Sequence, residues 1–345
     1  MSIAQRTAIV TTAAGLGLAL VATATAAAAA TSSVPSAAPT PKGCVTVAAT
    51  IPVGGSPKGV AVNPKTSTIY VTNVVGRAVS VISGRTNTVT ATISVGFGPQ
   101  GVAVNPKTNT IYLANQFDNT VSVISGRTNT VTATIPVGSL SSPMGVAVSR
   151  KTNTIYVANV NGDSVSVISG RTNTVTATIP VGSGSNPQAV AVNPKTNTIY
   201  TANAGTDTVS VISGRTNTVT ATIPVGVGPF GVAVNPKTNT IYVANLFDNT
   251  VSVISGRTNT VTATIPVGLG PFGVAVNPKT NTIYVTSQFG IPGTVSAISG
   301  RTNTVIATIP VGLSPQGIAV NPKTNTAYVA NSGSGTVSVL APCPK

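Results

Sequence analysis

Residues 101–135 read GVAVNPKTNTIYLANQFDNTVSVISGRTNTVTATI, and this stretch decides the fold. Four short runs in it, 101–104, 110–115, 120–125 and 130–135, are rich in β-branched and small residues and largely alternate apolar with polar side chains. The segments between the runs contain Asn, Pro, Asp and Gly, which favour tight turns. Alternation with a period of two residues, broken by turns every few positions, predicts four short antiparallel strands. We name these strands a to d in chain order.

The same unit recurs along the chain at a nearly constant period. Gly-Arg-Thr-Asn-Thr-Val begins at residues 84, 126, 170, 214, 256 and 300, so that successive copies lie 42 or 44 residues apart. Asn-Pro-Lys-Thr begins at 63, 105, 193, 235, 277 and 321, and the equivalent site at 149 reads Ser-Arg-Lys-Thr. Periods of this length occur in propellers and in helical arrays. The Thr and Val content and the Gly and Pro in every unit exclude helices. The repeat therefore predicts an all-β, seven-bladed β-propeller over residues 43–345, with four antiparallel strands per blade.

The two ends of the repeat region predict how the ring closes. Residues 45–54 match the outer strand d of the other copies, whereas the last copy has strands a, b and c only. An N-terminal strand that completes the last blade would leave no sheet edge open at the seam. In this alignment Cys44 and Cys343 occupy neighbouring positions of one c–d turn, which predicts a disulfide between them; two free thiols are the alternative.

The residues before the repeats have a different composition. Residues 1–30 contain one charge, Arg6, then an apolar stretch at 8–21, and then an Ala/Thr segment with several A-x-A sites. This pattern predicts a cleaved signal peptide, with a retained membrane anchor as the alternative. Residues 31–42 are rich in Ser, Pro and Ala, which is typical of a flexible linker. We therefore expect a secreted or cell-surface protein with no transmembrane segment in the mature chain.

The repeat resembles a known family. The runs TIYVTN at 68–73, VSVI at 79–82 and NTVTATI at 87–93 resemble the YVTN-family β-propeller repeat, which occurs in surface-layer-type proteins and exported bacterial propellers. The resemblance covers residues 44–340. It implies a propeller fold and a binding or surface role.

The charges of the repeats sort by turn type. In antiparallel blades the a–b and c–d turns lie on one face, and the b–c and d–a loops lie on the other. Fourteen of the 19 basic residues are in a–b and c–d turns, whereas all four acids, Asp118, Asp163, Asp207 and Asp248, are in b–c loops. The basic residues are Lys65, Lys107, Arg150, Lys151, Lys195, Lys237, Lys279 and Lys323 in the a–b turns, and Arg85, Arg127, Arg171, Arg215, Arg257 and Arg301 in the c–d turns.

Two concentric rings of cations on one face predict attraction of an anionic cell-wall polymer or glycan. The alternative is that a repeated turn simply repeats its charge and thereby gives solubility. Sequence-specific recognition of nucleic acid is not expected, because the chain carries no recognition module.

One position varies between otherwise similar repeats. It follows an unvarying Pro just before strand a, and because the innermost strand of a propeller lines the axis, these side chains should ring the mouth of the channel. Variable residues on a rigid scaffold favour a ligand-binding site; drift in an exposed loop is the alternative. The residues are Lys58, Gln100, Met144, Gln188, Phe230, Phe272 and Gln316. All seven tyrosines, by contrast, share one strand-b position, which predicts packing between blades.

The sequence offers little chemistry for catalysis. Nucleophilic catalysis needs a positioned base, yet the chain has no His and no Glu, and the four Asp are expected away from the axis. Propeller lyases that open streptogramin rings use a catalytic His, which has no counterpart here. We expect no catalytic residues, no cofactor and no metal site, although a weak Ca²⁺ site at Asp118 or Asp248 remains an alternative.

Together these observations predict an exported, non-enzymatic propeller that acts as a ligand-binding or cell-surface interaction scaffold. An envelope or matrix protein attached to anionic polymer through its basic face is the first alternative, and a propeller lyase is the second. We expect the protein to be a monomer.

Overall fold

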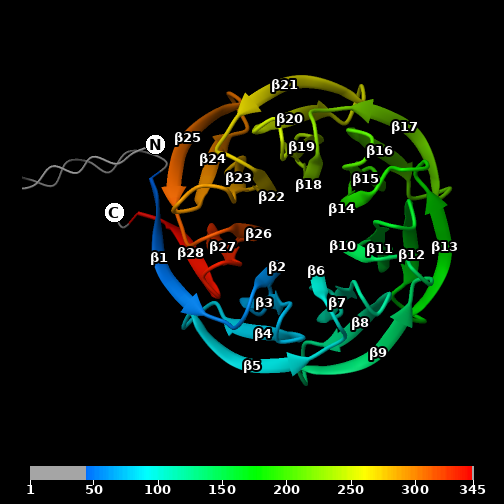
Figure 1. Cartoon of the computed structure of the whole chain (residues 1–345), viewed down its shortest axis with the longest axis horizontal. Helices are drawn as coiled ribbons and strands as arrows, with labels where there is room; N and C mark the ends of the chain where they lie inside the picture. The colour runs from blue at the N-terminus through cyan, green and yellow to red at the C-terminus, as the bar shows by residue number, and fades with distance from the viewer. Residues whose placement is uncertain (1–43, 344–345) are drawn as a thin grey trace, which may run out of the picture. The chain divides into compact units, whose positions relative to one another are not determined.

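The computed structural model describes residues 44–343, so the predicted signal peptide and linker lie outside the described residues. Within this range the chain forms 28 strands in seven four-stranded antiparallel sheets, arranged as blades around a central axis (Figure 1). The predicted all-β, seven-bladed propeller is confirmed.

The strands occupy four concentric positions. The innermost strands are β2 (Pro57–Asn63), β6 (Pro99–Asn105), β10 (Pro143–Ser149), β14 (Pro187–Asn193), β18 (Pro229–Asn235), β22 (Pro271–Asn277) and β26 (Pro315–Asn321). The second strands are β3 (Thr68–Asn73), β7 (Thr110–Asn115), β11 (Thr154–Asn159), β15 (Thr198–Asn203), β19 (Thr240–Asn245), β23 (Thr282–Ser287) and β27 (Thr326–Asn331). The third are β4 (Ala78–Ser83), β8 (Thr120–Ser125), β12 (Ser164–Ser169), β16 (Thr208–Ser213), β20 (Thr250–Ser255), β24 (Thr294–Ser299) and β28 (Thr336–Pro342). The outermost are β1 (Val45–Pro52), β5 (Thr88–Ser94), β9 (Thr130–Pro136), β13 (Thr174–Pro180), β17 (Thr218–Pro224), β21 (Thr260–Pro266) and β25 (Thr304–Pro310).

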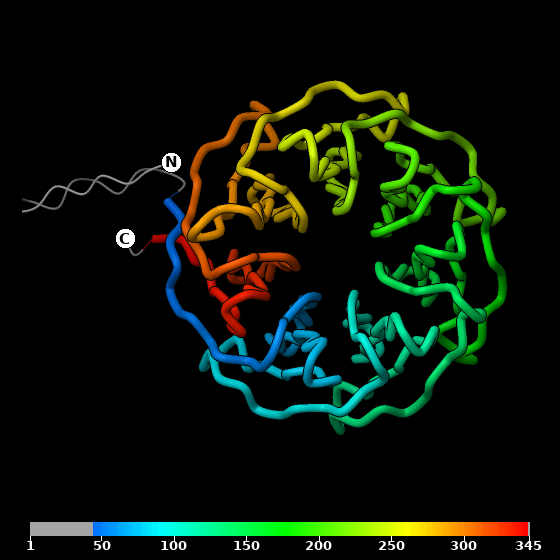
Figure 2. Tube along the Cα trace, viewed as in Figure 1, coloured from blue at the N-terminus to red at the C-terminus, as the bar shows by residue number. Residues whose placement is uncertain are grey.

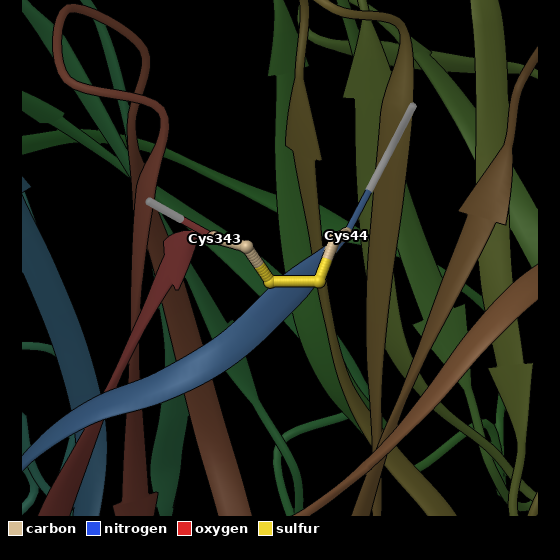
Figure 3. Close-up of a disulfide and its surroundings, with 2 residues drawn as sticks. All are labelled: Cys44 and Cys343. Carbon is tan, nitrogen blue, oxygen red and sulfur yellow. A yellow bond between two sulfur atoms is a disulfide. The ribbon is translucent and has the colours of Figure 1, made fainter. Parts of the chain in front are cut away.

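The first strand of the chain completes the last blade. β1 pairs antiparallel with β28, from Val45 opposite Pro342 to Pro52 opposite Thr336, and the blade has the strand order β1-β28-β27-β26. The chain trace shows this N-terminal strand on the outer rim beside the C-terminal one (Figure 2). Both the predicted closure and the disulfide are confirmed: Cys44 and Cys343 are bonded, with their Cα atoms 5.4 Å apart (Figure 3).

The hydrophobic core lies between blades rather than within one. Each of seven clusters combines residues of two adjacent blades. In one of them, Tyr200 of β15 packs with Ile241 of β19 and Ile254 of β20. All seven tyrosines are buried, which confirms their expected place between blades. Because apolar burial is the main favourable term in folding, a blade depends on its neighbours for stability.

The innermost strands approach one another closely at the axis. The residue after the variable position is Gly in six blades and Ala189 in the seventh. A Cβ built at Gly101 would overlap the backbone oxygen of Met144 in the next blade, and one at Gly59 would overlap that of Gln100. Glycine permits this close approach in six blades because it has no side chain, and the blade of β14 accommodates the single methyl group of Ala189.

The structure corrects the position of the variable residues. Lys58 and its equivalents were expected in the loop before strand a, but the innermost strand already begins at the preceding proline. The register of β2 against β3 shifts between Pro57 and Val60, so Lys58 lies in a bulge of the strand itself. Phe230 and Phe272 are likewise strand residues of β18 and β22 and not loop residues. Proline lacks the backbone donor of the ladder, and it is therefore tolerated as the first strand residue at such a bulge.

No helix within residues 44–343 has the length and apolar character needed to span a bilayer.

Candidate functional site

The bulges of the seven innermost strands surround a cavity of ≈ 200 Å³ on the propeller axis. Its walls come from three successive positions of each strand: the variable residue, the following Gly or Ala, and a Val or Ile. A bulge turns an extra side chain out of the regular ladder, and here it directs that side chain toward the axis. The structure thus brings together all seven predicted residues, namely Lys58, Gln100, Met144, Gln188, Phe230, Phe272 and Gln316.

The cavity has an apolar side and a polar side. Phe230 and Phe272 come from the neighbouring blades of β18 and β22, and their ring centroids are 5.1 Å apart at an interplanar angle of 34°. Strand β2, which carries Lys58, lies two blades from β22 with β26 between them, and β6, which carries Gln100, lies across the ring from the two Phe strands (Figure 1). In blade order Lys58 stands between Gln316 and Gln100. A ligand in this cavity would therefore meet aromatic rings on one side and a cation flanked by amides on the other.

Two of the three cavity glutamines are held by other side chains, whereas Gln188 donates from Nε2 to the backbone oxygen of Asn186 over 3.3 Å. Gln100 donates from Nε2 to Oε1 of Gln116 over 2.8 Å, and Gln116 donates to Oγ of Ser142 over 3.0 Å. Gln316 donates to Oε1 of Gln288 over 3.5 Å. Each supporting glutamine follows the last residue of a second strand, in a b–c loop. Sequence reasoning missed both, although Gln at a position that is Val, Ala, Leu or Ser in the other copies was an available signal.

Lys58 is the one titratable side chain in the cavity lining. Among the described residues, no ion pair or hydrogen bond holds its ammonium group. Desolvation by burial lowers the pKa of Lys58 below its ordinary value of 10.5. A partly buried cation without a counter-charge carries a free-energy cost that an anionic ligand would offset.

The four aspartates serve the loops and not the cavity. Asp118 accepts a hydrogen bond from the backbone N–H of Phe97 over 2.7 Å, and Asp248 accepts one from Val227 over 2.7 Å. Asp163 accepts from Gly184 and Asn186, and Asp207 accepts from Gly228. These carboxylates tie d–a loops to b–c loops, and within the described range no three His, Cys, Asp or Glu side chains gather as a metal site would require.

The opposite face carries the predicted basic residues. The a–b turns join the two inner strands of each blade and the c–d turns join the two outer strands, so the cations form an inner ring and an outer ring. All fourteen side chains are exposed. No acidic residue lies in these turns, since the four aspartates are all in b–c loops or at their ends on the other face.

Comparison with known proteins supports the fold. A search of curated proteins finds no match to the chain. Among solved structures, a chain of Kuenenia stuttgartiensis hydrazine synthase is similar with a TM-score of 0.72 at 21% sequence identity, covering 82% of this chain and 95% of that chain. At this identity the similarity shows the fold alone. The family model described as lactonase, 7-bladed beta-propeller, matches residues 86–268, which is more than half of the 345 residues. The chain belongs to this lactonase-type family of seven-bladed β-propellers.

Proposed function

We propose that this protein is an exported, non-catalytic binding module whose axial cavity takes a single-ring ligand that has an apolar face and an acidic group. One observation carries the proposal: the variable side chains of seven otherwise similar blades converge on a single cavity with a Phe pair on one side and an unpaired lysine on the other. The disulfide supports a non-reducing compartment.

The size and lining of the cavity define the ligand class. A volume of ≈ 200 Å³ is below the roughly 300–1,000 Å³ of drug-sized sites, which favours a ligand of one ring. The apolar face of a sugar ring or an aromatic ring would stack on Phe230 and Phe272. Its carboxylate would pair with Lys58, and the amides of Gln100 and Gln316 would bind remaining polar groups.

Lactone hydrolysis is the competing function, because the family takes its name from that activity. Membership of a propeller family does not by itself assign a reaction. Hydrolysis needs a base to activate water, and in the cavity that role would fall to Lys58, since the chain has no His or Glu. Its lowered pKa is the one feature that favours this alternative.

Calorimetric titration with a panel of sugar acids and aromatic acids, each with its neutral amide, tests the proposal. Phe230→Ala with Phe272→Ala should weaken binding roughly tenfold or more through lost apolar contact. Lys58→Gln should weaken binding of the acids and leave that of the amides unchanged. Phe117→Ala, an exposed aromatic outside the cavity lining, is the matched control and should have no effect.

The same proteins decide between binding and catalysis. Lactone turnover that disappears in the Lys58→Gln protein would show the cavity to be an active site and would refute the non-catalytic function. Binding that is unchanged in both cavity variants would refute the cavity as the site.

A further inference from the structure

The basic face contains grooves between successive blades. One, of ≈ 590 Å³, is centred on the blade of β14–β17 and is lined by Lys151 from the preceding blade, Lys195 and Arg215 from its own turns, and Asn259 from the following blade. Tyr200 also lines this groove. Cations from an a–b turn and a c–d turn thus face a single concavity, rather than standing apart on a flat surface.

The preceding blade repeats the arrangement. Its groove, of ≈ 260 Å³, is lined by Arg171 and Tyr156 together with Thr152 and Asn217, the last of these from the turn of the next blade. At the ring seam the hydroxyl of Tyr328 likewise lies at the c–d turn of the following blade, 2.9 Å from a Cβ built at Gly84. The tyrosine and the a–b turn recur in all seven blades and the Arg-bearing c–d turn in six, so the sequence repeats most components of this site around the ring.

The tyrosine hydroxyls supply the observation that points to a ligand. Tyr156 and Tyr200 are each only 1% exposed, yet both line the grooves. None of the side-chain hydrogen bonds among residues 44–343 uses either hydroxyl, and neither hydroxyl is among the fully enclosed polar atoms that lack a partner, so each hydroxyl reaches the space of its groove. Burial raises the pKa of both tyrosines, so each keeps its proton and is available as a donor. The larger groove therefore offers the O–H donor of Tyr200 beside three cations, and the smaller one offers that of Tyr156 beside Arg171.

We propose that these inter-blade grooves bind the acidic groups of a linear acidic polysaccharide, with the Lys and Arg side chains pairing with the charge and the tyrosine O–H donating to it. The Thr and Asn side chains that line the same grooves suit the hydroxyls of sugar residues. Repetition of the site around the ring would give avidity to a polymer that no single acidic sugar would have. This site is separate from the axial cavity, and the proposal does not rest on the proposed function.

The surroundings favour a polymer over a lipid surface. Every exposed large hydrophobic side chain in the described range lies either on an outermost strand, such as Val89 and Ile306, or in a loop of the opposite face, such as Phe117 and Leu269. The turns of the basic face therefore present no side chain that would insert into a bilayer. They present cations, hydroxyls and amides.

Capture of the full chain on immobilised polygalacturonate, over a series of salt concentrations, tests the proposal. Tyr156→Phe with Tyr200→Phe should weaken capture severalfold without changing the slope of log affinity against log salt, because no charge is removed. The melting temperature should stay unchanged, since neither hydroxyl bonds to another described residue. Lys151→Gln with Lys195→Gln and Arg215→Gln should weaken capture roughly tenfold and reduce that slope.

The controls separate the grooves from net charge and from the cavity. Arg77→Gln removes a cation from the opposite face, where Arg77 stacks on Phe97, and should leave capture unchanged. Equal losses in the Arg77 and groove variants would refute the proposal, as would unchanged capture in the tyrosine variant. Anionic vesicles or duplex DNA binding as tightly as the polysaccharide, with the same response to the groove substitutions, would also overturn it. Loss of capture in the Phe230→Ala, Phe272→Ala protein would place the polymer in the axial cavity and refute it too.

Discussion

At the residue scale, Lys58 shows how a single difference among repeated blades places a charge in an inner wall. Its equivalents are neutral in the six other blades. The bulge directs its side chain to the axis, where burial lowers its pKa and no acidic partner relieves the cost. A partly buried cation without a counter-charge lowers the free energy of unfolding. Such local losses of stability are common at residues that serve binding.

Because of this cost, the ionisation of Lys58 should make the free energy of unfolding depend on pH. Because the folded pKa lies below the unfolded value of 10.5, charged Lys58 destabilises the folded state at neutral pH, and the penalty fades as pH rises from the lowered pKa toward 10.5. Lys58→Met should therefore raise the urea midpoint at pH 7, and its advantage should shrink at alkaline pH.

Urea titrations of the wild type and variant at several pH values measure this effect. Lys65→Met, which changes an exposed turn lysine, provides the control for replacing a lysine by methionine. An advantage of Lys58→Met that is constant with pH would mean that packing, and not charge, produces it.

At the scale of elements, the blades are joined by asparagines as well as by the apolar core. The last residue of an innermost strand donates to the a–b turn of the next blade, as when Asn235 Nδ2 donates to Asn281 Oδ1 over 2.6 Å. Its own Oδ1 accepts from the backbone of Lys237 over 3.0 Å. Four other junctions carry the same bond, between Asn63 and Asn109, Asn105 and Asn153, Asn193 and Asn239, and Asn277 and Asn325.

Removal of one such inter-blade asparagine hydrogen bond should destabilise the ring. Asn235 is fully buried, so Asn235→Ala leaves both the turn amide and Asn281 without their partner and should lower the free energy of unfolding by about 1–3 kcal/mol. Chemical denaturation measures the change. Thr238→Ala in the exposed part of the same turn should cost much less, and equal costs for the two variants would show that the inter-blade bond contributes nothing.

The sequence alone did not predict this hydrogen bond between asparagines of adjacent blades. Asn-Pro-Lys is typical of a turn, and its asparagine was interpreted as a turn residue alone. The partner lies 46 or 48 residues away in the next copy, and only the curvature of the ring brings the two asparagines together. The bulge at Lys58 was not predicted, because it too depends on contacts between repeats. The pairing of a Pro-x-Gly segment changes with how closely the innermost strands of adjacent blades approach each other.

At the scale of the whole molecule, the repeat determined most of what sequence could predict. The blade count, the strand order, the closing strand, the disulfide and the two chemically distinct faces all follow from the alignment of the copies. The convergence of the seven variable residues followed from their common position beside the axis. The grooves of the basic face could not be predicted from the alignment, because they form between turns of different blades and no single repeat contains one.

The closing strand supplies a prediction at this scale. β1 is linked to its blade by strand pairing and by the disulfide. Every other outermost strand is linked by strand pairing and by a c–d turn that joins it to the third strand of the same blade. Cys44→Ser with Cys343→Ser should lower the free energy of unfolding by up to about 5 kcal/mol, given the 299-residue separation of the cysteines. Hydrogen exchange should quicken in β1 and remain slow in β5. Equal exchange in both strands would show that pairing alone secures the closure.

The near-identity of the outermost strands has a consequence for assembly. Five of the seven contain the sequence TVTAT followed by Ile, and β1 differs little, so we expect the edge of the last blade, when β1 is displaced, to accept the corresponding strand of a second chain. An open ring thus has the complementarity needed for domain-swapped polymerisation. The disulfide between Cys44 and Cys343 makes the closure covalent within one chain, so a strand exchange between chains would first require its reduction.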